Sequence, residues 1–193
     1  MSPRLPPVPV QEWPPAMRGA LAAMAPPNPR HPVPERRDDR PKGRNLLGLF
    51  AHHPELTRAY NTFNGHLLFA TTLTPRQREL LVLRVGVLRD AEYEWLQHKV
   101  IATDLGMTAE EIDRVTEGPD ADGWTPLDAA LLRAVDELVA DARIGEETWA
   151  ALAVELDAQQ LLDLVFTVGA YDVLAMAMRT FGVEVDEDLA RWK

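Results

Sequence analysis

The sequence predicts an all-α protein, and three observations support this fold class. No segment of the 193-residue chain shows the sustained two-residue alternation of a half-buried strand. From residue 45 onward, apolar residues recur at helical spacing, and helix-start signals such as Thr-Pro separate the segments. Hydrophobic residues make up 46% of the chain, which is enough to bury a core. We therefore expect a bundle of about seven or eight helices.

The first 44 residues differ from the rest in proline content and in charge. Twelve of the 16 prolines lie in residues 1–41, and residues 1–44 carry eight Arg or Lys against four Asp or Glu. This composition predicts an extended, proline-stiffened arm (1–44) with at most one short helix around residues 13–24. Its apolar residues favour an arm lying on the acidic body of its own or a neighbouring subunit. A disordered tail is the alternative.

Residues 45–193 form the predicted helical domain. Pro54 opens a first helix, which runs to about residue 69. Thr74 and Gln77 form a capping box that begins a second helix, which runs to about residue 89. A third helix follows at 91–105, and Gly106 ends it. Further helices are expected at 108–117, 126–143, 146–156 and 158–181.

Composition excludes several classes of function. The chain contains no cysteine, which rules out disulfides, thiolate metal sites and cysteine-based redox chemistry. Its net charge of −10 and pI near 4.9 disfavour a nucleic-acid partner, because phosphate binding needs a basic face. We find neither an apolar signal-peptide core nor an apolar stretch of about eighteen residues, so we expect a cytoplasmic protein without a membrane partner.

Glu79 stands out in the helix predicted at 75–89. That helix is apolar on nearly all faces, which predicts a central position in the bundle. A carboxylate on such a helix has to be paired or hydrogen-bonded, since burial of a lone charge is costly. The alternative is that Glu79 forms a purely structural ion pair with Arg76 or Arg84.

The next helix places an acid and an imidazole together. Glu94 and His98 are four residues apart and so share one helical face, which continues through apolar residues. Burial and mutual attraction tune such a pair to exchange protons near neutral pH. The alternative is an ordinary surface pair worth about 0.2–0.5 kcal/mol. No metal site is expected, because His98 lacks a histidine partner four residues away.

These residues carry a family resemblance. The run Tyr93-Glu94-Trp95-x-x-His98, preceded by Glu79 in a Pro-x-x-x-Glu segment, resembles the carboxymuconolactone decarboxylase family. That family also contains the alkylhydroperoxidase AhpD type. The resemblance covers roughly residues 45–185 and implies an AhpD-like helical bundle.

The AhpD pattern, Glu-x11-Cys-x2-Cys-x3-His, can be placed on this chain residue by residue. Glu79 takes the glutamate position and His98 the histidine position, with identical spacing. Ala91 and Glu94 occupy the two cysteine positions. The proton-relay residues are therefore kept and both redox sulfurs are absent, which is similar to the decarboxylase branch.

The resemblance implies roles for these residues and a cofactor-free reaction. In the decarboxylase branch an unsaturated lactone acid loses carbon dioxide, and the resulting dienolate is protonated. His98 is then the expected proton donor, Glu94 orients and tunes it, and Glu79 relays protons. Tyr93 and Trp95 are expected as pocket walls. His66, three residues after Phe63, is a further candidate for binding the small-molecule substrate, with a structural histidine as the alternative.

Two other functions stay open at this point. One is an AhpD-like antioxidant or peroxidase-family protein, which the absence of cysteine disfavours because peroxide reduction needs a thiolate. The other is a non-catalytic oligomeric binding protein. We expect a homo-oligomer in any case, because the helices are apolar on many faces. The resemblance implies a trimer or hexamer, with a dimer as the alternative.

Overall fold

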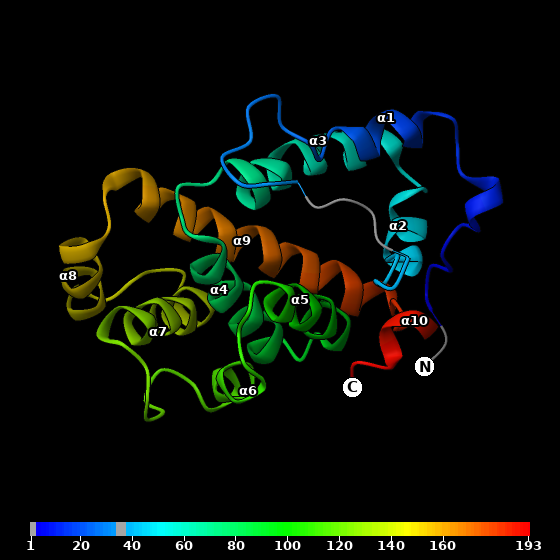
Figure 1. Cartoon of the computed structure of the whole chain (residues 1–193). Helices are drawn as coiled ribbons and strands as arrows, with labels where there is room; N and C mark the ends of the chain where they lie inside the picture. The colour runs from blue at the N-terminus through cyan, green and yellow to red at the C-terminus, as the bar shows by residue number, and fades with distance from the viewer. Residues whose placement is uncertain (1–2, 34–37) are drawn as a thin grey trace. The chain divides into compact units, whose positions relative to one another are not determined.

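The computed structural model describes residues 3–33 and 38–193, and every regular element in these ranges is helical. The predicted all-α fold class is confirmed (Figure 1). The chain divides into two compact units. The first combines the chain up to Thr71 with Ala177–Lys193, and the second is Thr72–Met176.

In its described residues, the first unit contains four complete α-helices, a 3-10 turn, a π-helical turn and the end of α9 from Ala177 onward. A helix was expected around residues 13–24, and one forms there. Helices α1 and α3 contact each other, and the Asn61 side-chain amide donates to the Ala20 carbonyl oxygen at 3.0 Å. The elements are η1 (Val10–Glu12), α1 (Ala16–Ala22), α2 (Arg44–Phe50), α3 (Pro54–Gly65), η2 (His66–Ala70) and α10 (Glu187–Ala190).

Apolar residues near the N-terminus pack within this first unit. The Val8 amide donates to the Gly48 carbonyl oxygen at 3.0 Å, and the Trp13 indole donates to the Val8 carbonyl oxygen at 2.9 Å. Val8 and Trp13 pack against a small core cluster, which consists of Met17, Ala20 and Ala51. The N-terminal segment therefore contributes side chains to a small hydrophobic core within the first unit.

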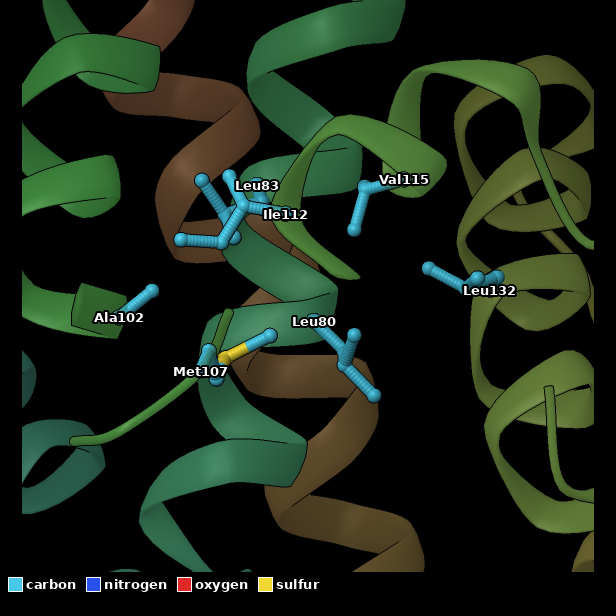
Figure 2. Packing of buried hydrophobic residues seen from close by; sticks show 7 residues of the cluster. All are labelled: Leu80, Leu83, Ala102, Met107, Ile112, Val115 and Leu132. Carbon is cyan, nitrogen blue, oxygen red and sulfur yellow. The ribbon is translucent and has the colours of Figure 1, made fainter. Parts of the chain in front are cut away.

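The second unit is built around α4, as the apolar character of that segment predicted. Helix α4 contacts α5, α6 and α7, and its residues from Leu80 to Val85 are all buried. Side chains from these four helices and from Met107 form one core cluster (Figure 2). The elements are α4 (Pro75–Leu88), α5 (Glu92–Asp104), α6 (Ala109–Glu117), α7 (Pro126–Asp141), α8 (Glu146–Glu155) and the part of α9 (Ala158–Phe181) that precedes residue 177.

The N-terminal ends of α4 and α6 are capped differently, although both have a threonine followed three residues later by Gln or Glu. At α4 the predicted capping box is complete, with the Gln77 amide donating to the Thr74 hydroxyl at 3.2 Å and the Thr74 amide donating to the Gln77 side chain at 2.9 Å. At α6 only Thr108 caps, by accepting from the Glu111 amide at 3.2 Å. The Glu111 carboxylate instead accepts from Arg76 of α4 at 2.8 Å, a stronger charge-assisted bond.

A tight turn makes α4 and α5 close neighbours. Asp90 adopts a left-handed backbone conformation (φ +49°), which reverses the chain within a few residues. A Cβ on Gly86 would lie 3.4 Å from the Trp95 backbone nitrogen, so the two helices approach closely. Helices α4 and α5 pack against each other on either side of this turn, and this packing determines the geometry of the site below.

Helix α9 is unusually apolar for its 24 residues. Its length and composition would allow it to cross a membrane, although the core helix of a water-soluble protein passes the same test. Half of its most apolar window is buried inside the protein.

Candidate functional site

A buried acid–base pair joins α4 and α5. Oε2 of Glu79 lies 2.7 Å from Nδ1 of His98, and Glu79 is fully buried while His98 is 6% exposed. The packing of α5 against α4 brings the two residues within hydrogen-bonding distance. Because Nδ1 faces the carboxylate, it is the protonated nitrogen, and Nε2 makes no hydrogen bond to a described residue.

Arg78 completes the surroundings of the carboxylate. Its Nε donates to Oε1 of Glu79 at 2.8 Å, and a second guanidinium nitrogen lies 2.7 Å from the same oxygen. Arg78 and Glu79 are both buried. Each oxygen of Glu79 therefore has its own cationic or hydrogen-donating partner.

The ion pair that sequence reasoning offered for Glu79 is corrected by this geometry. Arg76 instead binds Glu111 and Asp128, with a distance of 2.7 Å from its NH1 to Oδ1 of Asp128. Arg84 binds Asp136 at 2.6 Å. Arg76 thereby links α4 to α6 and α7, and Arg84 links α4 to α7.

The pKa of Glu79 is set by two opposing effects. Burial disfavours the charged carboxylate and would raise the pKa. The charge and hydrogen bond of His98, followed by those of Arg78, outweigh burial and hold the pKa below its ordinary value. Glu79 is therefore a carboxylate at neutral pH, suited to keep His98 in one tautomer and to stabilise its cationic form.

Glu94 behaves in the opposite way. It is 2% exposed, and neither of its oxygens has a hydrogen-bond partner among the described residues. Burial, with a smaller contribution from the negative charge of Asp172, raises its pKa well above the ordinary value. The orienting contact to His98 that we expected from Glu94 is made by Glu79. The surroundings of Glu94 favour its neutral carboxylic acid form.

Two residues of α9 that sequence reasoning missed approach these groups. The Tyr171 ring meets the His98 ring edge-on, with centroids 4.9 Å apart and planes at 88°. Asp172, the next residue, forms an ion pair with Arg89, with one oxygen 3.0 Å from a guanidinium nitrogen. No local sequence spacing relates Tyr171 to His98, so their contact becomes visible only in the folded structure.

The remaining predicted site residues lie in different surroundings. Tyr93 is buried, 3% exposed. Trp95 is half-buried and packs against the core cluster of Figure 2, and its part as a pocket wall stays a prediction. His66 is exposed at the start of the π-helical turn in the first unit, and its part in substrate binding stays a prediction.

A further unpartnered polar atom lies on α9. The Thr167 hydroxyl is buried and has no hydrogen-bond partner among the described residues. Thr167 is four residues before Tyr171 and so lies on the same helical face. Glu94 lies one helical turn before His98, and Thr167 one turn before Tyr171, and both have unused hydrogen-bonding capacity, a feature that native cores seldom show without a reason. Among described residues, no three His, Asp or Glu side chains are grouped to hold a metal ion.

A model of the carboxymuconolactone decarboxylase family matches residues 54–137, a range that includes Glu79, Glu94 and His98. The comparison with curated proteins gave no match. The family match therefore rests on the segment that carries the acid–base pair.

Solved structures show the same fold at low sequence identity. An uncharacterized peroxidase-related protein from Ralstonia eutropha JMP134, described as an alkylhydroperoxidase AhpD core, is 21% identical over 86% of this chain and 96% of its own, with a TM-score of 0.68. A protein from Agrobacterium tumefaciens, described as a putative antioxidant defence protein AhpD, is 16% identical over 71% of this chain and 94% of its own, with a TM-score of 0.67.

Debrominase Bmp8 is similar over an even larger part of the chain. Its apo structure is 11% identical over 97% of this chain and 94% of its own, with a TM-score of 0.75. A cysteine-to-alanine variant of Bmp8 in complex with 2,3,4-tribromopyrrole gives a TM-score of 0.74 at 13% identity, covering 100% of this chain and 96% of its own. At these identities the likeness shows the fold, which is AhpD-like.

Proposed function

Because this chain belongs to the carboxymuconolactone decarboxylase family and contains no cysteine, we propose that it is a cofactor-free lyase or isomerase acting on a small carboxylated or lactone substrate. The observation that carries this proposal is the buried Glu79–His98 pair, in which Nε2 of His98 makes no hydrogen bond to a described residue. A histidine held by a carboxylate on one nitrogen can exchange a proton with a substrate on the other.

The proposed reaction follows from the charges of the pair. The bond between the substrate carboxylate and the ring breaks, and its electron pair moves into the conjugated carbonyl as carbon dioxide leaves. The Nε2–H of the cationic His98 then gives its proton to the resulting carbanion. Glu79 keeps its negative charge throughout and stabilises the imidazolium. Solvent returns the proton to His98, so no oxidant or metal is needed.

Glu94 has a separate task in this proposal. A neutral carboxylic acid buried without a partner can donate a hydrogen bond to the carbonyl oxygen that gains negative charge as carbon dioxide leaves. A carboxylate at this position would repel that charge. The raised pKa of Glu94 therefore supports a role as a hydrogen-bond donor.

The AhpD-like antioxidant reaction is the second candidate, and the sequence argues against it. Peroxide reduction by that chemistry passes through a sulfenic acid, which this chain has no cysteine to form. The Bmp8 complex offers a different hint, since that protein binds a small planar heteroaromatic ring after its cysteine is replaced. A ligand of similar size, bearing a carboxylate, is the substrate class that we would test first.

The proposal can be tested by supplying 4-carboxymuconolactone and related small lactone acids and following carbon dioxide release. In deuterium oxide the product should gain one carbon-bound deuterium, at a carbon over which the electron pair of the broken bond was delocalised. His98→Ala should reduce turnover about 10²–10⁴-fold. His52→Ala, at an exposed histidine of the first unit, is the matched control and should keep full turnover. Full turnover by His98→Ala would refute the proposal.

A further inference from the structure

Thr167 is a fully buried threonine of α9 whose hydroxyl has no hydrogen-bond partner among the described residues. A threonine inside a helix can satisfy its hydroxyl by donating to the carbonyl oxygen four residues earlier. Thr57, Thr62 and Thr103 do so, at 3.0, 2.9 and 2.8 Å. Thr167 does not make this bond, so its hydroxyl keeps its hydrogen-bonding capacity inside the second unit.

The packing of α9 gives no reason for a hydroxyl at residue 167. Valine is branched at Cβ like threonine but has no polar side-chain atom, and the same helix uses valine at residues 165, 168 and 173. Val168, the next residue, is buried as Thr167 is. A buried hydroxyl without a partner opposes folding, because its hydrogen bond to water is lost and not replaced. Packing alone therefore does not account for this threonine.

Contacts on either side of Thr167 show where it lies along α4. Four residues earlier, Asp163 accepts from the hydroxyl of Thr72, just before α4, at 2.7 Å. Five residues later, Asp172 is paired with Arg89, just after α4. Thr167 is therefore level with the interior of α4, the helix that carries the carboxylate of the acid–base pair.

The same face of α9 contacts the histidine of the site. Thr167 precedes Tyr171 by one helical turn, and the Tyr171 ring meets the His98 ring with centroids 4.9 Å apart. On α5, Glu94 precedes His98 by one turn, and its oxygens also lack a partner among the described residues. Side chains one turn apart on a helix are neighbours. Two helices thus each bring one buried group with unused hydrogen-bonding capacity next to the rings of Tyr171 and His98.

We propose that Thr167 binds the substrate of this site by donating a hydrogen bond to the carboxylate that leaves as carbon dioxide. The inference rests on the proposed reaction. A neutral hydroxyl suits this task because it orients the carboxylate without the stronger, charge-assisted bond of an arginine, which would hold the negative charge where it is. The assignment leaves Glu94 for the carbonyl oxygen and His98 for the protonated carbon. The substrate is then a lactone acid whose carboxylate meets α9 and whose carbonyl oxygen meets α5.

Steady-state kinetics on 4-carboxymuconolactone test the role of the hydroxyl. Thr167→Val should raise KM about 2–10-fold, the effect of losing one hydrogen bond, while kcat changes by less than about twofold. Thr167→Ser keeps the hydroxyl and should have a KM near that of wild type. An unchanged KM in Thr167→Val, or an equally raised KM in Thr167→Ser, would overturn the proposal.

A ligand titration followed by NMR makes the test independent of turnover. The probe is tetrahydro-5-oxo-2-furancarboxylate, a saturated lactone acid without the conjugation that the reaction needs, and γ-butyrolactone is the same ring without the carboxylate. Thr167→Val should raise the dissociation constant of the acid about 2–10-fold and leave that of γ-butyrolactone unchanged. Wild type that binds the acid but turns over no lactone acid would refute the proposed reaction alone. Wild type that binds the acid no better than γ-butyrolactone would overturn the role of Thr167.

Urea unfolding without ligand distinguishes a ligand-binding hydroxyl from a structural one. Thr148 is the matched control in the second unit, because it is 3% exposed and its hydroxyl donates to Oε1 of Glu137 at 2.7 Å. Thr148→Val should lower the urea midpoint, whereas Thr167→Val should keep or raise it, since no bond within the protein is lost. A midpoint that falls as far in Thr167→Val as in Thr148→Val would show that the folded protein already satisfies the hydroxyl, for example through a buried water, and would overturn the proposal.

Discussion

Oε2 of Glu79 lies 2.7 Å from Nδ1 of His98, although the two residues are 19 positions apart. The short α4–α5 turn at Asp90 makes this contact, and Arg78 secures the other carboxylate oxygen. The pair is anchored on two helices whose packing forms the centre of the second unit. A proton-transfer group held in this way needs little reorganisation during a reaction.

Glu79→Gln should reduce turnover about 10²–10⁴-fold, as loss of a positioned acid or base commonly does. The amide cannot stabilise an imidazolium, and it leaves the buried Arg78 guanidinium without its anion. Steady-state kinetics on the substrate found in the carbon dioxide assay measure the loss. Glu110→Gln, at an exposed glutamate on α6, is the control for removing one negative charge. Equal turnover in both variants would contradict a role for Glu79.

The sequence was sufficient to predict the local parts of this site. The capping box at Thr74, the glycine stop at residue 106 and the helical spacing of Glu94 and His98 are short-range signals, and the helices formed where they indicated. The family pattern singled out Glu79 and His98 together. The contact of α4 with α5 across the short turn then brings the two side chains together.

The partners of those residues were beyond sequence reasoning. Adjacent helical residues point in different directions, so the Arg78–Glu79 contact depends on the bending of a long side chain in a particular core. Tyr171 reaches His98 only because α9 packs beside α5, which no local signal indicates. For the same reason Glu94 was assigned to His98 by spacing, although packing leaves it without a hydrogen-bond partner among the described residues.

The raised pKa of Glu94 predicts how stability depends on pH. A folded-state pKa above the unfolded value means that the folded protein binds this proton more tightly. The stability that Glu94 contributes is complete below the unfolded pKa of about 4.3 and is lost as pH rises through the folded pKa. Within that window the free energy of unfolding falls by about 1.4 kcal/mol per pH unit for one proton.

Glu94→Gln removes this titration while keeping a buried polar side chain of similar size. Urea unfolding of wild type and variant across pH 5–9 should therefore show that the free energy of unfolding falls less steeply with pH in the variant. Within the window, the difference in slope should correspond to about one proton. Glu110→Gln should follow the wild-type curve, because Glu110 is exposed and its pKa is lowered. Parallel curves for wild type and Glu94→Gln would show that Glu94 is ionised in the folded protein.

Arg76 should be a stability residue of the second unit. It joins α4 to α6 through Glu111 and to α7 through Asp128, whose side chain is only 6% exposed. Arg76→Ala leaves that nearly buried carboxylate unpaired and should lower the free energy of unfolding by about 1–3 kcal/mol. Arg133→Ala breaks an exposed pair with Asp120 and should cost less than about 1 kcal/mol. Similar urea midpoints for the two variants would contradict this difference.

The Asp128 carboxyl adds a pH signature to that test. Burial would raise its pKa, but the Arg76 hydrogen bond and other favourable contacts hold it below the ordinary value. Its contribution to stability is therefore present above the unfolded pKa of about 3.9 and is lost as pH falls through the folded pKa. The gap between wild type and Arg76→Ala should narrow below about pH 4, which acid titration of the urea midpoint measures.

Replacement of Gly65 by alanine, which adds one methyl group, should lower the stability of the protein. Gly65 ends α3 in the first unit, and an added Cβ would lie 2.2 Å from the Met24 carbonyl oxygen, a distance that requires the backbone to move. Helix propensity alone would favour alanine over glycine by about 1 kcal/mol. The steric conflict is larger, because overpacking typically costs about 1–3 kcal/mol, so Gly65→Ala should be destabilising.

Gly86→Ala is the control for the steric conflict expected in Gly65→Ala. Its Cβ would sit 3.4–3.6 Å from Trp95, which is ordinary contact, so this variant should unfold within about 1 kcal/mol of wild type. Thermal and urea unfolding of the two single variants, monitored by circular dichroism, distinguish close packing at Gly65 from a general intolerance of alanine in these helices. Equal stability of Gly65→Ala and wild type would mean that the chain after α1 can shift away from α3 at little cost.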